Sequence, residues 1–218
     1  MVKTDQAFRP HVLDMFEPQD HPNDFKYEGG PPVAPYDAAG WTLAYLMNVK
    51  FDRVIEDFKG PFEKMPHGEL LNATPKALPK GSGYALSSAA NESYLAVNEL
   101  LKGGAEVFRN QADGSFYVPA SAKAKTILDK AEHGFGMRVT ATKKPAKLRK
   151  VAPARIAIWD TYGGSMPSGW LRFIMEQYHF DAKVIYAPDI DAGDLKSKYD
   201  VIVFVGGSIP AYVANPTA

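Results

Sequence analysis

The chain contains no cysteine among its 218 residues. This absence excludes disulfide bonds, thiolate zinc sites and every cysteine nucleophile, but it leaves the compartment open because secreted proteins can also lack cysteine. A net charge is absent too, since 25 Lys and Arg residues balance 25 Asp and Glu residues. A neutral chain lacks the broad electrostatic attraction typical of nucleic-acid-binding proteins, so we expect no nucleic-acid partner.

Long apolar runs are missing as well. No segment approaches the roughly 18 consecutive apolar residues of a transmembrane helix, so we expect no membrane span. The first residues, Met1 to Gln6, contain no apolar signal-peptide core, so we expect no signal peptide in this chain. Hydrophobic residues nevertheless make up 45% of the chain and aromatic residues 12%. This content excludes a fully disordered or fibrous protein and suffices for one sizeable core or two smaller ones.

Proline is concentrated near the N-terminus, where the first 82 residues hold 10 of the 17 prolines. Each proline fixes its own φ and restricts the residue before it, so residues 1–35 are predicted to be irregular. Interspersed apolar residues argue against a free linker. We therefore interpret residues 1–82 as a proline-rich packing arm, with one helix over 38–47, capped by Asp37, and one short strand over 50–55.

Residues 83–142 are predicted to form a small unit of order βαββαβ. Expected strands cover residues 84–87, 106–109, 116–118 and 137–142, and expected helices run from Asn91 to Gly103 and from Ser121 to Gly134. The order is that of the split βαβ, or ferredoxin-like, arrangement. Many unrelated functions use this arrangement, so it predicts no particular chemistry.

Residues 143–153 form a basic segment that holds five Lys and Arg residues between positions 143 and 150. One interpretation is a patch that binds anions or nucleic acid. The other, which the zero net charge favours, is a solvated linker between two domains.

Residues 154–218 are predicted to form a partial α/β domain. Three short apolar runs at residues 156–159, 183–186 and 201–205 are typical of parallel strands covered on both faces. A helix is expected over 168–178, and a polar crossover over 189–199. The helix is expected to bury one stripe of five residues, namely Trp170, Leu171, Ile174, Met175 and Tyr178. The result is a truncated flavodoxin-like sheet with an exposed last strand, which predicts self-association through residues 201–205.

Two glycine-rich loops follow the first and third of these strands, where open parallel sheets bind ligands. The candidate ligand-binding residues are Tyr162, Gly163, Gly164, Ser165, Ser168, Gly169, Gly206, Gly207 and Ser208. The spacing of Gly164 and Gly169 matches a P-loop, but Trp170 and Leu171 replace the Lys and Ser/Thr that a P-loop requires. The alternatives are a small-ligand or anion site, and a tight turn in which Ser165 or Ser168 only caps the helix.

Catalytic and metal motifs are sparse. The five histidines, at positions 11, 21, 67, 133 and 179, include no pair at helical i, i+4 spacing. His21 and Asp24 are close in sequence, but the intervening proline makes a surface loop the simpler interpretation. No G-x-S-x-G motif is present. The three aspartates at 189, 191 and 194 lack the Glu of a calcium loop, so we interpret them as a turn and a cap.

Four strings are more specific than any of these motifs: AFRPHVLDMFEPQDHP at 7–22, PYDAAGWTL at 35–43, GSFYVP at 114–119 and WDTYGGSMPSGW at 159–170. They resemble the region after the catalytic domain in large bacterial proteins of the zinc carboxypeptidase (carboxypeptidase A-like) family. The resemblance covers nearly the whole chain. It implies that residues 154–218 are similar to the glutamine-amidotransferase-like domain of those proteins, and that the parent protein is periplasmic or extracellular.

The chain departs from that family where catalysis is concerned. The family's zinc site contains an H-x-x-E pair, and none of the five histidines here begins one. Amidotransferases use a cysteine nucleophile, which is also absent. We therefore expect no catalytic residue, metal ligand or cofactor in this chain, with zinc confined to the parent's catalytic domain.

The sequence thus predicts a non-catalytic accessory region of a metallocarboxypeptidase involved in proteolysis. Its expected roles are domain packing, substrate presentation or partner binding, with the parent's catalytic domain or a peptide substrate as partner. The alternatives are a flavodoxin-like module that binds a flavin or a small anion, and a chain that is itself a hydrolase.

Overall fold

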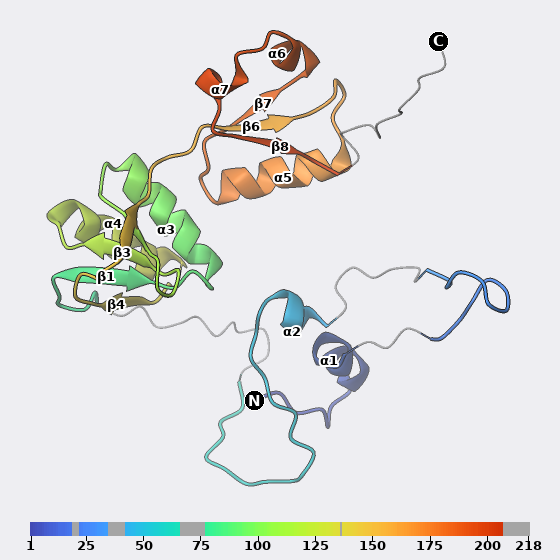
Figure 1. Ribbon diagram of the computed structural model, residues 1–218. Coiled ribbons are helices and arrows are strands. Elements are labelled where there is room, and N and C mark those ends of the chain that lie inside the picture. Colours follow the sequence, from blue (N-terminus) through green and yellow to red (C-terminus); the bar gives the residue numbers. More distant parts are fainter. Residues whose placement is uncertain (19–21, 35–41, 66–76, 136, 207–218) are drawn as a thin grey trace, which may run out of the picture. The chain divides into compact units, whose positions relative to one another are not determined.

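The computed structural model describes residues 1–18, 22–34, 42–65, 77–135 and 137–206 (Figure 1). The chain divides into two compact units, Met1–His67 and Gly68–Ala218, which are described separately. Within the described residues, no helix combines the length and the apolar character that crossing a membrane requires.

The N-terminal unit contains two short helices, α1 (Arg9–Phe16) and α2 (Leu43–Leu46). Helix α1 forms where the proline content predicted an irregular chain, because Pro10 lies in the first turn, where its missing N–H costs no helical hydrogen bond. The hydroxyl of Thr42, just before α2, donates a hydrogen bond of 2.7 Å to the backbone carbonyl of Glu17, just after α1. This contact joins the two helices.

The strand predicted at residues 50–55 is wrong. The segment has no regular secondary structure and no partner strand in the described part of the chain, and it is held by side chains instead. The ring of Phe51 lies 5.4 Å from that of Phe16 and 5.5 Å from that of Tyr45, and Arg53 forms an ion pair of 2.5 Å with Glu17. Of the helix predicted at 38–47, residues 38–41 fall outside the described residues and Leu43–Leu46 is helical.

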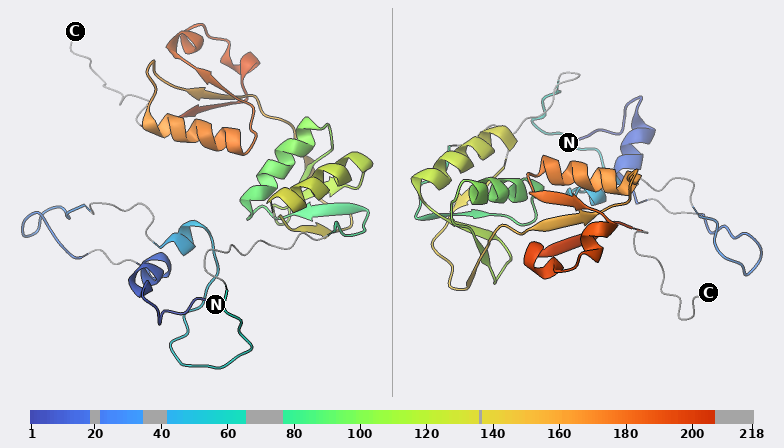
Figure 2. Two further views of the ribbon diagram at one scale, coloured as in Figure 1. Left: turned by 180° about the vertical axis from the view of Figure 1, so that it is seen from behind. Right: turned by 90° about the horizontal axis from the view of Figure 1, so that it is seen from above.

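The second unit begins with a five-stranded antiparallel sheet and two helices on one of its faces (Figure 2). The elements are β1 (Gly83–Leu86), α3 (Asn91–Lys102), β2 (Phe108–Asn110), β3 (Phe116–Pro119), α4 (Ala122–Phe135), β4 (Val139–Ala141) and β5 (Leu148–Lys150). The strand order is β4-β1-β3-β2-β5. The predicted succession βαββαβ is confirmed for β1 to β4, whereas the fifth strand was not predicted.

The core of this sheet is formed by apolar side chains that alternate along the strands and recur on one side of α3 and α4. Strand residues such as Leu86, Phe116 and Val118 pack against Leu100 of α3 and Leu128 of α4, and all five are at most 5% exposed. The hairpin between β2 and β3 turns at Gly114, whose φ of +72° suits glycine. This part of the chain therefore has a complete core of its own.

Strand β5 lies inside the segment interpreted as a basic linker. It pairs with β2, with Arg109 opposite Arg149 and Asn110 opposite Leu148. Because β4 and β5 are at opposite edges, residues 142–147 must cross from one edge of the sheet to the other. At the start of this crossover the N–H of Thr142 donates to the carbonyl of Gly83, and at its end the carbonyl of Lys147 accepts from the N–H of Gln111. The segment is therefore a crossover followed by an edge strand, and not a linker. The alternation of apolar Leu148 with charged Arg149 suits a strand that adds to the edge of an existing sheet.

The remaining elements form a three-stranded parallel sheet of order β7-β6-β8. They are β6 (Ile156–Trp159), α5 (Met166–Gln177), β7 (Ala182–Ile185), α6 (Ala187–Asp191), α7 (Leu195–Lys198) and β8 (Val201–Phe204). Three parallel strands and the helix between the first two were predicted, and all are confirmed. Two short helices occupy the predicted polar crossover. Among the described residues β8 pairs only with β6, so the predicted exposed edge is confirmed for that part of the chain.

The buried stripe predicted on α5 is partly wrong. Leu171, Met175 and Tyr178 are half-buried, but Trp170 is 62% exposed and Ile174 is 49% exposed. The helix turns its 168, 171, 175 and 178 positions toward the sheet. A three-stranded sheet can cover only one stripe of a helix, so the second apolar stripe is left outside.

Candidate ligand site at the carboxyl edge of the parallel sheet

The loop after β6, the residue after β7 and the residues after β8 meet at one edge of the parallel sheet, as parallel pairing requires. This is the edge at which the sequence placed its candidate ligand-binding residues. The polar and aromatic groups of the loop come from residues 160–165, and Tyr186 directly follows β7.

The loop after β6 is anchored by Asp160, which is only 4% exposed. Its backbone N–H donates to the carbonyl of Ile185 in β7 at 3.0 Å, and its side-chain Oδ1 accepts from the N–H of Thr161 at 2.9 Å. Its Oδ2 accepts a hydrogen bond from the hydroxyl of Ser168, which is 1% exposed. Asp160 therefore ties the start of the loop to α5 and to β7.

Helix α5 begins with Ser165 as N-cap. The Ser165 Oγ accepts a hydrogen bond of 3.2 Å from the backbone N–H of Ser168, which satisfies one of the free donors of the first turn. The predicted cap is thus confirmed for Ser165. Ser168 has a different role, since its hydroxyl is used by Asp160.

The glycines of the loop differ in what their backbone requires. Gly163 and Gly164 have φ angles of +93° and +70°, and Gly164 donates a hydrogen bond of 2.9 Å to the carbonyl of Thr161. A side chain at either position would be strained by this backbone conformation. Gly169 and Gly206 have no such requirement, and an added Cβ at Gly163, Gly169 or Gly206 would meet no atom within 4 Å. The space beside these three positions is open.

Two tyrosine rings stack at this edge. The rings of Tyr162 and Tyr186 are nearly parallel, at an angle of 9°, with centroids 4.6 Å apart, and Tyr162 is 78% exposed. The outer face of Tyr162 is therefore a flat aromatic surface beside the two turn glycines. Sequence reasoning singled out Tyr162 but missed Tyr186 and Asp160, although Asp160 directly follows a predicted strand and Tyr186 was the last residue of another.

The structure brings most of the candidate residues together, since Tyr162, Gly163, Gly164, Ser165 and Ser168 lie in one loop and the helix start after it. Gly169 is in the first turns of α5, and Gly206 follows β8. The candidates at 207 and 208 lie outside the described residues. The described part of the edge offers an aromatic face, the Ser165 hydroxyl and loop backbone groups, all of which can contact a small ligand.

Two hollows lie elsewhere, along α4. One of about 530 Å³ is lined by Lys125, Thr126, Asp129 and Lys130. Another of about 390 Å³ surrounds the start of α4, near Lys80, Ser121 and Tyr84. Neither hollow touches the glycine loops.

The acidic residues near α6 and α7 act as caps and turn residues, as the sequence predicted. The Asp189 carboxylate accepts from the backbone N–H of Tyr186 at 3.0 Å, and the Asp194 carboxylate accepts from the Ser197 hydroxyl at 2.6 Å. In the described part of the chain no three His, Asp or Glu side chains are grouped as they would be to hold a metal ion. His179 pairs with Glu99 at 2.7 Å, and the histidine at 21 lies outside the described residues.

Comparisons of this chain with protein-family models, with characterised proteins and with solved structures found no match.

Proposed function

We propose that the chain is a non-catalytic accessory region of a protein of the zinc carboxypeptidase family, exported to the periplasm or beyond. In this role it packs against the catalytic domain of the parent protein, or presents a peptide substrate to it. The observation that supports the proposal is an apolar surface on the parallel sheet and its helix.

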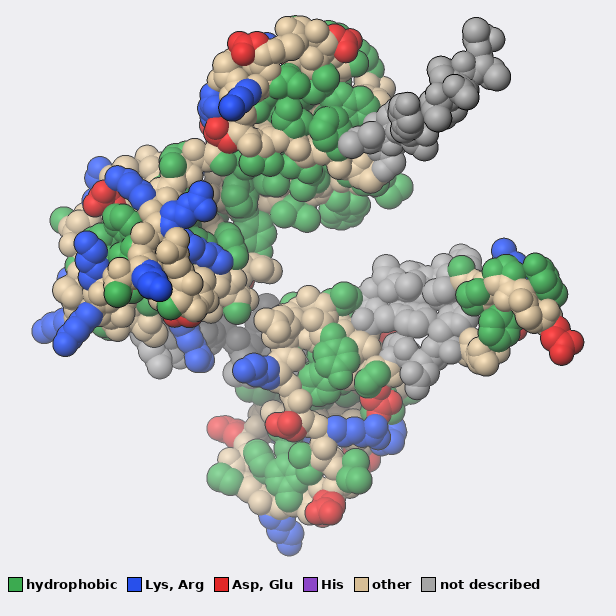
Figure 3. Space-filling model, viewed as in Figure 1, with side chains coloured by type: hydrophobic (Ala, Val, Ile, Leu, Met, Phe, Trp, Pro, Cys, Tyr) green, Lys and Arg blue, Asp and Glu red, His purple; other side chains and the backbone are tan. Residues whose placement is uncertain are grey.

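This surface, called here the α5–β8 surface, consists of large apolar side chains that are at least 42% exposed. Its members are Met166, Trp170, Phe173 and Ile174 of α5, together with Val201 and Phe204, which point to opposite faces of the edge strand β8. Hydrophobic side chains gather over this part of the molecule in Figure 3. By contrast, no described residue between 77 and 151 is a large apolar side chain with comparable exposure. The five-stranded sheet covers its own core, and the parallel sheet does not.

The two sheets differ in exposed apolar surface because they differ in how completely helices cover them. We interpret β1 to β4 with α3 and α4 as a ferredoxin-like unit, which is complete with these elements. We interpret β6 to β8 as part of a flavodoxin-like, amidotransferase-like sheet. Parallel sheets of that kind are normally covered by helices on both faces, so an apolar helix flank and an apolar edge strand favour burial against a further surface.

A binding experiment tests this proposal. The zinc carboxypeptidase catalytic domain encoded in the same genome is titrated with the chain by calorimetry. The double substitution Trp170→Glu/Phe173→Glu should weaken binding by at least about tenfold, because it places charges in a desolvated apolar contact. Arg172→Glu, on the opposite flank of the same helix, is the matched control and should leave binding within about threefold. Failure of the unmodified chain to bind would contradict the proposal.

Catalysis is tested separately on the purified chain. Zinc hydrolysis needs three protein ligands and an open position for water. We expect less than one equivalent of zinc after dialysis and no release of C-terminal residues from test peptides. Stoichiometric zinc with chelator-sensitive release would overturn the non-catalytic assignment, and His11 and His21 would be the first residues to replace.

A second candidate function is supported by the stacked tyrosines. In this alternative the carboxyl edge binds a flavin or a small anion, with a planar ring stacked on Tyr162. Titration with flavin mononucleotide, phosphate and sulfate tests it. Tyr162→Ala should weaken flavin binding but not phosphate binding, and Gly164→Val should weaken both. If the unmodified chain binds none of the three saturably, the loop is only a turn and a cap.

A further inference from the structure

The zero net charge of the chain conceals an uneven distribution. Residues 77–151, which form the five-stranded sheet and its helices, contain twelve Lys and Arg residues and six Asp and Glu residues, a net charge of +6. The rest of the chain carries the balancing −6. A basic domain within a neutral chain indicates a local, short-range attraction for acidic groups rather than long-range steering.

Six of these basic residues lie on β2, on β5 and on the crossover that leads to β5. We call the end of the sheet formed by β2 and β5 the β5 edge; its basic residues are Arg109 of β2, Lys147 at the end of the crossover, and Arg149 and Lys150 of β5, whereas Lys143 and Lys144 lie earlier in the crossover. All of them except Arg109 are exposed, and Arg109 is half-buried. Several Lys and Arg side chains are visible on this unit in Figure 3.

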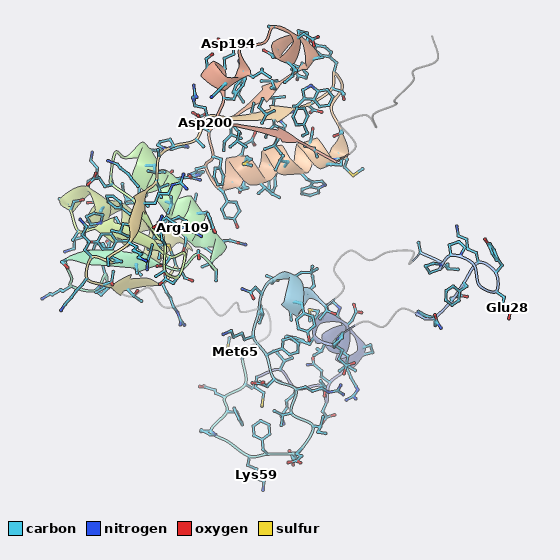
Figure 4. All side chains as sticks on the ribbon, in the orientation of Figure 1. Glu28, Lys59, Met65, Arg109, Asp194 and Asp200 are labelled. Carbon is cyan, nitrogen blue, oxygen red and sulfur yellow. The ribbon has the colours of Figure 1, made fainter. Side chains whose placement is uncertain are left out.

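The charges of the β5 edge are poorly neutralised within the chain. Arg109 and Arg149 are directly opposite each other across the two strands, an arrangement that destabilises a sheet when both residues have the same charge. Arg109, labelled in Figure 4, lies 4.5 Å above the ring of Phe116. In the described part of the chain only Lys150 forms an ion pair here, with Glu106 at 2.8 Å. Carboxylates supplied from outside would offset this repulsion.

The backbone of β5 is also available on its outer side. Val151 donates to the carbonyl of Val107 at 2.9 Å, and the carbonyl of Lys147 accepts from Gln111 at 3.0 Å. Alternation along an antiparallel pair then directs the backbone groups of Leu148 and Lys150 away from β2. Among the described residues β5 has no second partner strand, so these groups form a free edge.

We propose that the β5 edge binds an extended acidic peptide segment of a partner protein, which adds to the sheet as a sixth strand. Successive side chains of a strand point to opposite faces, so Arg149 and Lys150 present positive charge on both faces of the edge. The segment that fits best has Asp or Glu at consecutive positions. Main-chain hydrogen bonds supply affinity and the basic side chains supply selectivity, as in other strand additions. This surface is separate from the α5–β8 surface and does not depend on its function.

An acidic peptide is favoured over nucleic acid by the apolar side chains of the unit. Single-stranded nucleic acid is bound on exposed aromatic side chains, and the described residues between 77 and 151 include no exposed aromatic ring. The simplest competing explanation is that the lysines protect an edge strand from aggregation. Both alternatives are outcomes of the following experiment.

The experiment measures fluorescence anisotropy of a labelled octapeptide with six glutamates, titrated with the full chain. Three further probes are the same peptide with lysine in place of glutamate, the glutamate peptide with alternate backbone amides methylated, and a short labelled single-stranded DNA. We expect saturable binding of the glutamate peptide alone. Binding should weaken as NaCl is raised from about 0.05 M to about 0.5 M, because the contacts are exposed ion pairs.

Two matched variants locate the site. Lys147→Glu/Arg149→Glu should weaken binding of the glutamate peptide by at least about tenfold through charge reversal. Lys123→Glu/Lys130→Glu changes the net charge equally on the exposed side of α4 and should leave binding within about threefold. Thermal unfolding followed by circular dichroism verifies that both variants are folded.

Three results would overturn the proposal. Absence of binding would leave edge protection as the role of the lysines. Equal binding of the methylated peptide would show a charge contact without strand addition, and tighter binding of the single-stranded DNA would show a nucleic-acid surface. None of these results bears on the α5–β8 surface, so failure here and failure of the accessory role are distinguishable.

Discussion

Arg155 holds both oxygens of the Asp200 carboxylate. Its Nη2 lies 2.8 Å from Oδ1 and its Nε 3.0 Å from Oδ2, and its backbone N–H also donates to Oδ2 at 2.8 Å. Arg155 directly precedes β6 and Asp200, labelled in Figure 4, directly precedes β8. The Arg155 guanidinium also donates to the carbonyls of Ser197 and Lys196. It therefore joins the starts of two parallel strands to the end of α7.

This pair predicts a pH dependence of stability. The hydrogen bonds from the Arg155 guanidinium and backbone lower the pKa of Asp200 to about 2, from 3.8. A carboxyl whose pKa is lower in the folded state stabilises the fold above its unfolded pKa, and this contribution is lost as pH falls through the folded value. Asp200→Asn should therefore lower the free energy of unfolding slightly at neutral pH, because both partners are exposed.

Urea unfolding of both proteins at several pH values provides the measurement. The difference between the unmodified chain and Asp200→Asn should be constant above a pH of about 5 and should disappear as the pH falls through about 2. Glu106→Gln, at a different ion pair, is a second test, since the Lys150 hydrogen bond also lowers the pKa of Glu106 and its contribution should be lost in the same direction. A difference that grows toward low pH would contradict the prediction.

Removing a hydrogen bond from the buried Asp160 carboxylate should lower the free energy of unfolding more than removing the exposed Arg155–Asp200 pair. Ser168→Ala removes one hydrogen bond from a carboxylate that is nearly inaccessible to water, and should cost about 1–3 kcal/mol of unfolding free energy. Ser165→Ala removes only the cap and should cost about 1 kcal/mol. Denaturant unfolding compares the two. Equal costs would mean that the Asp160 contact does not differ in energy from an ordinary cap.

Alanine substitutions at two glycines, one in the loop after β6 and one at the start of α5, should change the free energy of unfolding in opposite directions. Gly164→Ala should lower the free energy of unfolding by about 1–2 kcal/mol, because alanine is strained at a φ of +70°. Gly169→Ala should raise it by roughly 0.5–1 kcal/mol, because the position is helical and the space around it is open. Thermal unfolding of the two variants suffices, and stabilisation by Gly164→Ala would show that the loop has a different backbone in solution.

The elements that the sequence predicted are those whose own residues carry a regular apolar pattern. Helices α3 and α4 carry apolar residues along one side, and Leu95, Val97 and Leu128 are buried. Residues 50–55 alternate as a strand does, yet a strand also needs a pairing edge, which local sequence does not reveal. Strand β5 was missed for the opposite reason, because only one of its three residues, Leu148, is apolar and its pairing with β2 cannot be read from so short a pattern.

At the candidate site, features that depend on neighbouring residues could be predicted from the sequence, and features that depend on distant residues could not. The loop glycines and the Ser165 cap could be predicted because turns and caps depend on neighbouring residues. The stack of Tyr162 on Tyr186 could not, because it depends on the register of two parallel strands. The exposure of Trp170 could not be predicted either, because its apolar spacing is the same whether or not a further surface covers the helix.

Strand β8 predicts self-association. Its four residues are apolar, Val201 is 45% exposed and Phe204 is 42% exposed, so the edge can pair with that of a second copy. Light scattering over a range of concentrations should show a dimer or larger species, and Phe204→Lys should shift it toward the monomer. Val54→Lys, at an exposed apolar position of the N-terminal unit, is the control. A strictly monomeric unmodified chain at high concentration would contradict this prediction.

The parallel stacking of Tyr162 and Tyr186 makes the carboxyl edge observable by spectroscopy. Tyrosine rings held in a fixed asymmetric environment contribute to near-ultraviolet circular dichroism, so the contribution of these two rings should change when the stack loosens. The signal requires the loop after β6 and the end of β7 to keep their mutual geometry. The protein thus carries an internal probe for local opening of this edge, which reports loop motion without a label and separately from loss of helix and sheet.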